Sequence, residues 1–316
     1  MSVKNEEKTL LIMVGSECNN NCSMCSVNGK NKIKSESTKN LKKIITEKSD
    51  TYQKIEFTGG EPTIRNDFYE LLGLANKIGY RQVAVSSNLR LFSYPKHAKK
   101  AAENGLDLAT TSLHGTEEIH NAITRTPNSY EQTIKGIENL KQEGVNISVN
   151  TVITALNIGN VFEMKKIIGK LNVNWSFLDL IPEGLERGVY DDLKASYSEI
   201  STVFSNLIES NKNFSLFTFF DYPYCIFSKN LINNPKVNFI AARERSTDFE
   251  NDGGFSTGRV INENGVYIDN HKERTSFCKK CEYGNICGGV WRSYLDLEGE
   301  KEIKSIAKKN NLIIDK

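Results

Sequence analysis

The amino-acid sequence predicts an α/β protein with a parallel sheet and crossover helices over most of its length. Between residues 9 and 182, short apolar stretches typical of buried strands alternate with amphipathic stretches of helical spacing. Such alternation is typical of parallel sheets, because parallel strands need a crossover connection. The chain has 316 residues, with 38% hydrophobic and 25% charged residues. These values suit one large globular domain with a small appendage.

The expected elements begin with a buried strand at residues 10–14, a cysteine-containing loop and a helix at residues 38–49. Further strands are expected at residues 54–58, 82–86, 106–112, 146–153 and 175–181, with helices at residues 67–78, 95–104, 130–143 and 161–171 between them. Together they make about six strand–helix units. In parallel barrels the chemistry gathers in the loops that follow the strands.

The alternation ends after residue 181. The sequence then predicts a long helix at 190–211, an aromatic-rich strand at 214–220, an irregular Asn-rich stretch at 228–254, a β-hairpin turning on Asn-Gly at 258–268 and a charged C-terminal helix. We therefore expect three parts. These are a barrel at residues 1–190, a connecting helix, strand and irregular linker with Cys225 at 191–256, and a small cysteine-containing domain at 257–316.

Charge and composition exclude several classes of function. The net charge of +2 is too small to attract nucleic acid or a membrane surface. No apolar run approaches the length of a membrane span, and residues 1–8 lack the apolar core of a signal peptide. We expect a cytoplasmic protein without nucleic-acid or membrane partners. Its seven cysteines then indicate metal ligation rather than disulfides.

Three cysteines near the N-terminus have the spacing Cys-x3-Cys-x2-Cys. Cys18, Cys22 and Cys25 follow the first strand and can hold three irons of a [4Fe–4S] cluster, leaving the fourth iron open. A structural zinc site or a redox pair is the alternative. Zinc sites usually use paired Cys-x2-Cys groups or add histidine, and no histidine precedes His97. The iron–sulfur cluster is therefore the favoured interpretation.

A second motif, Gly59-Gly60-Glu61-Pro62, directly follows the second strand. Together the two motifs resemble the radical S-adenosylmethionine (SAM) superfamily. The resemblance implies a partial (β/α)6 TIM-like barrel and a SAM-binding [4Fe–4S] cluster whose open iron is chelated by the amino and carboxylate groups of SAM. It also implies a one-electron reductant such as flavodoxin or ferredoxin, reductive cleavage of SAM to a 5′-deoxyadenosyl radical, and abstraction of a hydrogen atom from the substrate.

The resemblance also implies residues for the SAM site. The backbone of the Gly-Gly-Glu-Pro segment and the Glu61 carboxylate would receive the SAM amino group. Further expected contacts to SAM come from Met24, Asn88, Ser112, Arg125, Asn150 and Ile181. Met24 stands where the family commonly has an aromatic residue before the third cysteine. His114 stands where relatives often have an acidic residue, and it is either a proton-transfer group or a structural histidine.

A second cysteine group, Cys-x2-Cys-x5-Cys-Gly-Gly, is formed by Cys278, Cys281 and Cys287. It resembles the SPASM and twitch extensions that hold auxiliary [4Fe–4S] clusters. A full SPASM extension needs seven cysteines, but the next expected position is Trp291. With Cys225 the remaining cysteines number four, enough to close one auxiliary cluster. Alternatively, Cys225 is a hydrogen-atom donor or a buried free thiol, and the other three cysteines bind zinc.

The leading functional hypothesis is oxidative modification or cross-linking of a ribosomally made peptide, because SPASM-like extensions occur most often on peptide maturases. A separate N-terminal peptide-binding domain is not expected, since the first strand begins by Thr9. The alternatives are oxidation or rearrangement of a small polar metabolite such as an amino sugar or nucleoside, and peptide epimerisation with Cys225 as hydrogen donor. From another class, the chain would be a non-catalytic iron–sulfur or zinc binding module.

Overall fold

The computed structural model describes residues 8–27, 34–210, 216–240, 247–250, 259–261, 267–269 and 271–313. These residues form two compact units. Unit 1 takes the described residues within 1–113, 117–150 and 246–256, and unit 2 those within 114–116, 151–245 and 257–316. The three-part division expected from the sequence remains a prediction. Both units combine parallel strands with helices, which confirms the α/β class.

Unit 1 contains a parallel sheet in the order β5-β4-β3-β2-β1-β9. The strands are β1 (Thr9–Met13), β2 (Lys54–Thr58), β3 (Gln82–Ser86), β4 (Leu108–Ser112), β5 (Asn146–Val152) and β9 (Thr247–Glu250). The first five correspond to predicted strands. β9 falls in the stretch expected to be irregular, and it pairs in parallel with β1 at the edge of the sheet.

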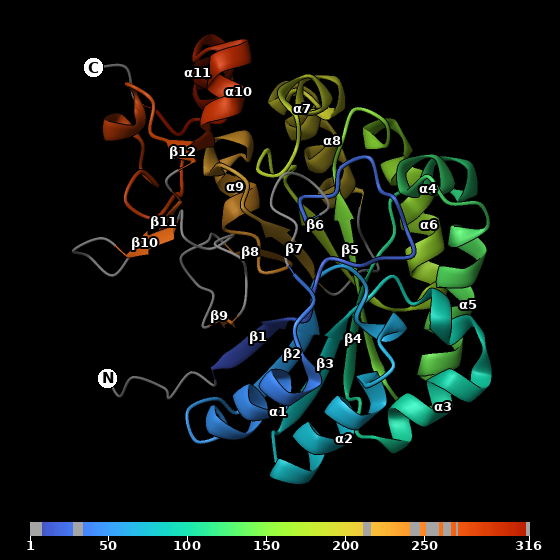
Figure 1. The fold of residues 1–316 in the computed structure, drawn as a ribbon. Helices are drawn as coiled ribbons and strands as arrows, with labels where there is room; N and C mark the ends of the chain where they lie inside the picture. Colours follow the sequence, from blue (N-terminus) through green and yellow to red (C-terminus); the bar gives the residue numbers. More distant parts are fainter. Residues whose placement is uncertain are drawn as a thin grey trace. The chain divides into compact units, whose positions relative to one another are not determined.

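The helices of unit 1 are α1 (Thr38–Glu47), α2 (Phe68–Ile78), α3 (Pro95–Glu103), α4 (Glu117–Thr124) and α5 (Ser129–Gln142), with 3-10 turns η1 (Pro62–Ile64) and η2 (Arg90–Ser93). Helices α1, α2 and α3 lie along the outer side of β1 to β4 (Figure 1). Their ends follow ordinary capping rules. The Ser37 hydroxyl accepts a hydrogen bond from the amide of Asn40, and Gly79 ends α2 with φ 102°.

The two faces of this sheet differ in polarity. On β2, Ile55 and Phe57 are buried while Glu56 is half-buried, and on β4 Ala109 is buried while Thr110 is half-buried. Register places Ser86 opposite Thr110 and Thr110 opposite Ser148. Neighbouring parallel strands point register partners to the same face. One face of the sheet is therefore apolar, and the other carries hydroxyl and carboxylate groups.

Unit 2 has a second run of parallel strands in the order β8-β7-β6. It comprises β6 (Asn174–Leu178), β7 (Phe217–Phe220) and β8 (Val237–Ile240), with η3 (Ile158–Asn160), α6 (Val161–Leu171), α7 (Arg187–Leu193), α8 (Tyr197–Glu209), η4 (Tyr224–Ile226) and α9 (Lys229–Ile232). Its core is aromatic. The rings of Phe177 and Phe204 lie 5.0 Å apart, and those of Phe204 and Phe219 lie 4.7 Å apart.

The single helix expected at residues 190–211 is wrong. Lys194 ends α7 in an extended conformation, and α8 begins after Ser196, whose hydroxyl accepts a hydrogen bond from the amide of Glu199. A serine with glutamate three residues later is the sequence pattern of a capping box, which favours the start of a new helix. Residues 211–215, including the beginning of the expected strand at 214–220, lie outside the described residues.

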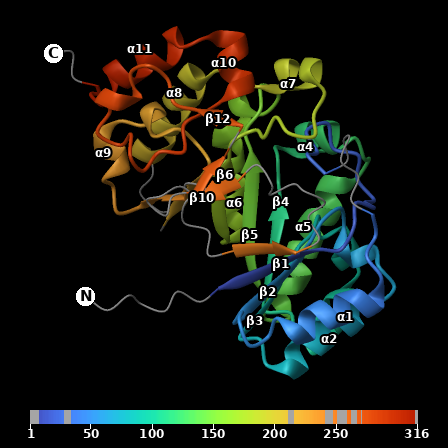
Figure 2. The same ribbon diagram turned by 60° about the vertical axis from the view of Figure 1, so that its left-hand side comes forward.

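The C-terminal part of unit 2 contains the expected antiparallel pair, β10 (Arg259–Ile261) with β11 (Tyr267–Asp269). The Asn-Gly turn predicted between them lies outside the described residues. A second small sheet pairs β12 (Lys272–Glu273) with β13 (Val290–Trp291), and the 3-10 turn η6 (Cys278–Lys280) lies between them in sequence. The expected charged helix is divided into α10 (Arg292–Glu298) and α11 (Lys301–Lys309). Helix α11 packs against α8 and η4 (Figure 2).

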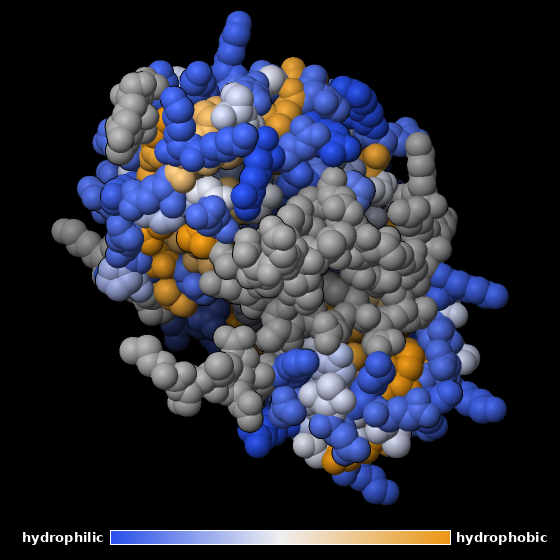
Figure 3. All heavy atoms as spheres, turned by 90° about the vertical axis from the view of Figure 1, so that its left-hand side faces the viewer, coloured by the Kyte–Doolittle hydropathy of each residue, from blue (hydrophilic) through white to orange (hydrophobic). Residues whose placement is uncertain are grey.

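Most coloured surface atoms in Figure 3 belong to hydrophilic residues, with small hydrophobic areas between them. In the part of the chain that the structure describes, no helix is long and apolar enough to cross a membrane.

Candidate functional site

The two sequence motifs of unit 1 touch each other through their backbones. The amide of Gly60 donates to the Gly15 carbonyl, and the amide of Glu61 donates to the Glu17 carbonyl, both at 2.7 Å. A Cβ on Gly59 would lie 2.4 Å from the Gly15 oxygen, and one on Gly60 would lie 2.2 Å from the Glu17 oxygen. The glycines are therefore required for the approach of this segment to the chain leading into Cys18.

Glu61 is buried and held by four hydrogen bonds. Its Oε1 accepts from the Thr63 amide (3.1 Å), the Thr63 hydroxyl (2.6 Å) and the Ser87 hydroxyl (2.7 Å). Its Oε2 accepts from the Asn88 amide at 2.7 Å. Burial raises the pKa of Glu61, although these hydrogen bonds act in the opposite direction. The carboxylate thus has a fixed position, and a cation placed at Oε2 would favour its ionised form.

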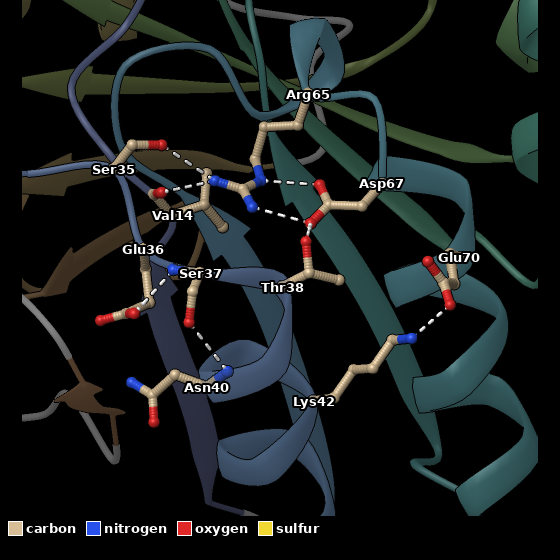
Figure 4. A network of polar contacts seen from close by, with 10 residues as sticks. All are labelled: Val14, Ser35, Glu36, Ser37, Thr38, Asn40, Lys42, Arg65, Asp67 and Glu70. Carbon is tan, nitrogen blue, oxygen red and sulfur yellow. Dashed lines mark hydrogen bonds and ion pairs between the residues drawn. The ribbon is translucent and has the colours of Figure 1, made fainter.

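Hydrogen bonds of the Arg65 side chain, shown in Figure 4, hold the segment that enters the cysteine loop in place. The guanidinium of Arg65 binds Asp67 through two hydrogen bonds of 2.8 and 2.7 Å, and it also donates to the Val14 carbonyl at 3.0 Å and the Ser35 hydroxyl at 3.1 Å. Burial opposes ionisation of Asp67, but the Arg65 and Thr38 hydrogen bonds and the Arg65 charge outweigh it and lower the pKa. This network joins the end of β1 to the start of α2.

The three cysteines of the loop lie close enough to influence one another electrostatically. Burial is the largest of the effects that raise the pKa of Cys22 to about 12, and the charges of Cys25 and Cys18 act in the same direction. The amide of Asn20 donates to the Cys18 sulfur at 3.4 Å. The loop is also bound to α4, since the amide of Ser23 donates to the Ile123 carbonyl at 2.8 Å. Three cysteines gathered on one loop can lose their protons together only when a cationic group binds them, and an iron–sulfur cluster is such a group.

The side chain of Arg90, which the sequence did not identify as part of the site, also binds the cysteine loop. The Arg90 guanidinium donates to the Asn20 side chain at 2.7 Å and the Gln132 side chain at 2.6 Å, and it also contacts the Asn19 carbonyl. Among the influences on Cys18, whose pKa is raised chiefly by burial, the Arg90 charge acts to lower it. Asn88 completes the network by donating to the Asn19 side chain at 2.6 Å. The only sequence signal is that Arg90 closely follows the predicted SAM contact Asn88.

The remaining predicted SAM contacts are distributed as follows. Ser112 and Asn150 are register partners on β4 and β5, and both are half-buried. Met24 is buried, whereas Arg125 is exposed after α4 with a left-handed φ of 51°. Pro62 begins η1 and is buried. The buried His114 and the half-buried Ile181 belong to unit 2. The roles of these residues remain predictions.

In unit 2 the four remaining cysteines line one pocket. Cys225 reaches it from η4, and Cys278, Cys281 and Cys287 from the chain between β12 and β13. Burial raises the pKa of Cys225, and the charges of the other three cysteines raise it further. The structure therefore groups Cys225 with the C-terminal cysteines, as the count of four required.

Several sulfurs in this pocket have hydrogen-bonding neighbours. The amide of Gly289 donates to the Cys287 sulfur at 3.4 Å, and the Thr275 hydroxyl lies 3.2 Å from the Cys278 sulfur. Among the described residues, no group of three or more His, Cys, Asp or Glu side chains converges closely enough to bind one metal ion. In a [4Fe–4S] cluster each thiolate binds a different iron. Four thiols around one pocket, with donors to their sulfurs, fit that ligand set.

Comparisons with known proteins identify similar proteins over part of the chain. The family model described as the radical SAM superfamily matches residues 12–170. An AdoMet-dependent heme synthase from Nitratidesulfovibrio vulgaris is 32% identical over 150 residues, which cover 46% of this chain and 40% of the relative. The mycofactocin maturase MftC of Mycolicibacterium smegmatis is 29% identical over 182 residues, covering 56% of this chain and 45% of the relative. The chain thus covers less than two thirds of the length of these relatives.

Solved structures resemble the chain over more of its length. The structure of anSMEcpe with bound AdoMet and the Kp18Cys peptide is 18% identical with a TM-score of 0.63, covering 96% of this chain and 95% of that one. SuiB of Streptococcus suis bound to precursor peptide SuiA is 14% identical with a TM-score of 0.62, covering 96% and 76%. At these identities the likeness concerns the fold. It confirms the expected partial TIM-like barrel, and this chain also has the expected C-terminal β-hairpin.

Proposed function

Because this chain belongs to the radical SAM superfamily of enzymes, we propose that it modifies a ribosomally made peptide by hydrogen-atom abstraction, using SAM and two [4Fe–4S] clusters. When bound, the first cluster and SAM supply the one-electron cleavage that yields a 5′-deoxyadenosyl radical in this family. A one-electron reductant such as flavodoxin or ferredoxin would supply the electron. Cys18, Cys22 and Cys25 would hold the first cluster.

The observation that carries the proposal is the backbone contact between the Gly59–Pro62 segment and the chain entering the cysteine loop. It brings the fixed Glu61 carboxylate close enough for its charge to raise the pKa of Cys18. A carboxylate beside a cluster with one open iron can accept the ammonium of an amino acid that chelates this iron. A charge-assisted hydrogen bond of this kind is stronger than a neutral one.

The other residues of unit 1 would orient and enclose SAM. Ser112 and Asn150 offer a neighbouring hydroxyl and amide on adjacent strand ends. Arg90 would keep the cysteine loop in place rather than touch the ligand, since its guanidinium is engaged by Asn20 and Gln132. Arg125 would bind the carboxylate or ribose of SAM through its guanidinium. Met24 would pack on adenine. Of the residues in unit 2, His114 is proposed as a proton-transfer group and Ile181 as a contact to adenine.

For unit 2 we propose one auxiliary [4Fe–4S] cluster on Cys225, Cys278, Cys281 and Cys287. The shared pocket and the donors to sulfur support this ligand set. The buried position of Cys225 among the other three thiols favours a ligand over a hydrogen-atom donor for epimerisation. A cluster with four protein ligands can accept an electron from a product radical, so the net reaction would be an oxidation or a cross-link.

The peptide substrate is supported by relatives. SuiB is described with a precursor peptide, anSMEcpe with a peptide, and both cover nearly all of this chain. A small polar metabolite is the second candidate. It is favoured by the polar face of the unit 1 sheet, where the Ser86 hydroxyl donates to Glu56 and where Thr110 and Ser148 are register partners on adjacent strands. A probable GTP 3′,8-cyclase of Sulfolobus acidocaldarius, which is 26% identical over 189 residues, also favours a small polar metabolite as the substrate.

The test is anaerobic reduction of the reconstituted protein with dithionite in the presence of SAM. We expect about eight irons per chain, from the stoichiometry of two clusters, and formation of 5′-deoxyadenosine and methionine. The Cys18/Cys22/Cys25→Ala variant should keep about half of the iron and produce neither compound. A wild-type protein that binds zinc instead of iron, or that leaves SAM intact, would contradict the proposal.

The substrate class requires a separate measurement. Anaerobic cell extract can be divided by ultrafiltration at about 1 kDa, which separates metabolites from longer peptides. Each fraction is then added to the reduced protein with SAM, and 5′-deoxyadenosine is quantified. Stimulation by the large fraction that is lost after protease treatment supports a peptide. Stimulation by the small fraction alone contradicts the peptide and favours the metabolite.

A further inference from the structure

A buried lysine lies next to the cysteine pocket of unit 2. Lys272 is only 7% exposed. It stands on β12 opposite Trp291 of β13, and its Nζ lies 4.2 Å from the centre of the Trp291 ring. The ammonium also donates a hydrogen bond to the Asp221 carbonyl. A buried charge is costly unless neighbouring groups compensate it, so this position requires an explanation.

On one side of Lys272 lies the carboxylate of Asp179, at the end of β6. Its Oδ2 accepts hydrogen bonds from the Trp291 indole at 2.9 Å and from the Tyr197 hydroxyl at 2.6 Å. The same indole thus binds the carboxylate through its N–H and the ammonium through its ring face. Burial raises the pKa of Asp179 to about 6, and the Lys272 charge is the largest influence against this shift. Asp179 is therefore the counter-charge of Lys272.

The same lysine lies close to the chain that carries Cys287, a proposed ligand of the auxiliary cluster. The Cδ of Lys272 would be 3.8 Å from a Cβ on Gly288, the residue after Cys287. Its ammonium donates to the carbonyl of Asp221, four residues before Cys225. The buried side chain therefore contacts residues close in sequence to two of the proposed ligands. By contrast, Lys279 and Lys280 lie between two of the cysteines on η6 but are exposed, where water screens their charge.

We propose that Lys272 raises the reduction potential of the auxiliary cluster and so makes it an electron acceptor, an inference that rests on the proposed cluster at Cys225, Cys278, Cys281 and Cys287. Reduction adds one electron and no proton to the cluster, so the reduced form is more negative by one charge. A buried cation close to a ligand stabilises this form more than the oxidised one. In turnover the electron would come from the substrate radical, which loses one electron and one proton to give the closed-shell product.

The experiment measures the potential of the auxiliary cluster rather than catalysis. The Cys18/Cys22/Cys25→Ala background removes the other cluster, and anaerobic redox titration with dithionite is followed by electron paramagnetic resonance. Lys272→Met, which keeps the length and removes the charge, should shift the potential to more negative values at unchanged iron content. Lys272→Arg should retain the potential. The matched control Lys280→Met removes a charge at an exposed site between two ligands and should produce a much smaller shift.

The inference is overturned if the auxiliary cluster has the same reduction potential in Lys272→Met as in Lys280→Met while its iron content is unchanged. If Lys272→Met fails to fold, Asp179→Asn at pH 8 provides the opposite test, since removing the counter-charge should shift the potential to more positive values. No shift or a negative shift in that variant would overturn the inference as well. The iron content of the Cys18/Cys22/Cys25→Ala protein, with Lys272 unchanged, is measured first. Its absence would refute the auxiliary cluster itself, and with it any role for Lys272.

Discussion

Replacement of Glu61 by glutamine tests the SAM site without touching a thiolate. The carboxylate accepts three hydrogen bonds at Oε1 and one at Oε2. Glutamine keeps one acceptor oxygen, which suits the three donors at Oε1. The NH2 group of the glutamine side chain then faces the backbone N–H of Asn88, so this half-buried N–H loses its hydrogen-bond acceptor. The cost to folding is about 1–3 kcal/mol, reduced by removal of a buried charge.

The effect on SAM is separate from this cost. A hydrogen bond to a charged group contributes about 1.5–3 kcal/mol, so Glu61→Gln should weaken SAM binding by roughly 10- to 150-fold. Ser112→Ala removes a neutral hydrogen bond of about 0.5–1.5 kcal/mol and should have a smaller effect. Binding is measured anaerobically by equilibrium dialysis with labelled SAM, together with iron content. Glu118→Gln, an exposed carboxylate on α4, is the matched control.

The reasoning is refuted if Glu61→Gln binds SAM like the wild type while both proteins carry the same iron. Loss of iron in Glu61→Gln alone would instead mean that the carboxylate supports the cysteine loop, and the assignment to the SAM ammonium would lose its basis.

Three further predictions concern the rest of the chain. Cys225→Ala should lower the iron content and change the auxiliary-cluster spectrum while uncoupled SAM cleavage continues; an unchanged spectrum would support a hydrogen-donor role instead. Arg90→Met removes three side-chain hydrogen bonds, about 2–3 kcal/mol of local order. The first cluster should then be retained less well than the second, as iron loss to a chelator can measure. Burial raises the pKa of Asp179 from 3.8 to about 6, so the folded state binds this proton more tightly than the unfolded state. The resulting stabilisation is complete below about pH 4 and is lost as the pH rises through 6, a change of about 3 kcal/mol. Thermal denaturation between pH 4 and 7 should show this slope, and Asp179→Asn should flatten it; an equal slope in both proteins would contradict the shift.

The predictions that succeeded used information close together in the chain. The strands β1 to β6 carry their apolar pattern within a few residues, and the cysteines of each group are neighbours in sequence. Cys225 was placed with the C-terminal group by counting alone, and the shared pocket agrees. Its place beside these thiols results from the turn η4, which no local pattern predicts.

Arg90 and Lys272 could not be identified because their partners are far away in sequence. Arg90 binds Asn20 and Gln132, and Lys272 contacts Trp291 and Asp221. In a sequence, a lysine that is buried in the fold looks the same as one on the surface. The tertiary structure alone decides which charges are desolvated.

The break between α7 and α8 is a different case, since its signal was present. Ser196 and Glu199 form a capping box, but the apolar pattern continues through the break, as the buried Leu193 and Ile200 indicate. At this position the capping signal outweighs the apolar periodicity.

The pairing of β9 with β1 has a consequence for how the chain folds. A ribosome delivers β1 first, and its outer edge stays without a neighbour until residues 247–250, near the other end of the chain, have been made. During synthesis this apolar edge offers unpaired amides and carbonyls to any other nascent chain. Production of this protein should therefore depend on slow translation or on chaperones that shield β1. A C-terminal truncation before β9 should yield aggregates, even though the cysteine loop and the Gly59–Pro62 segment of the proposed SAM site remain.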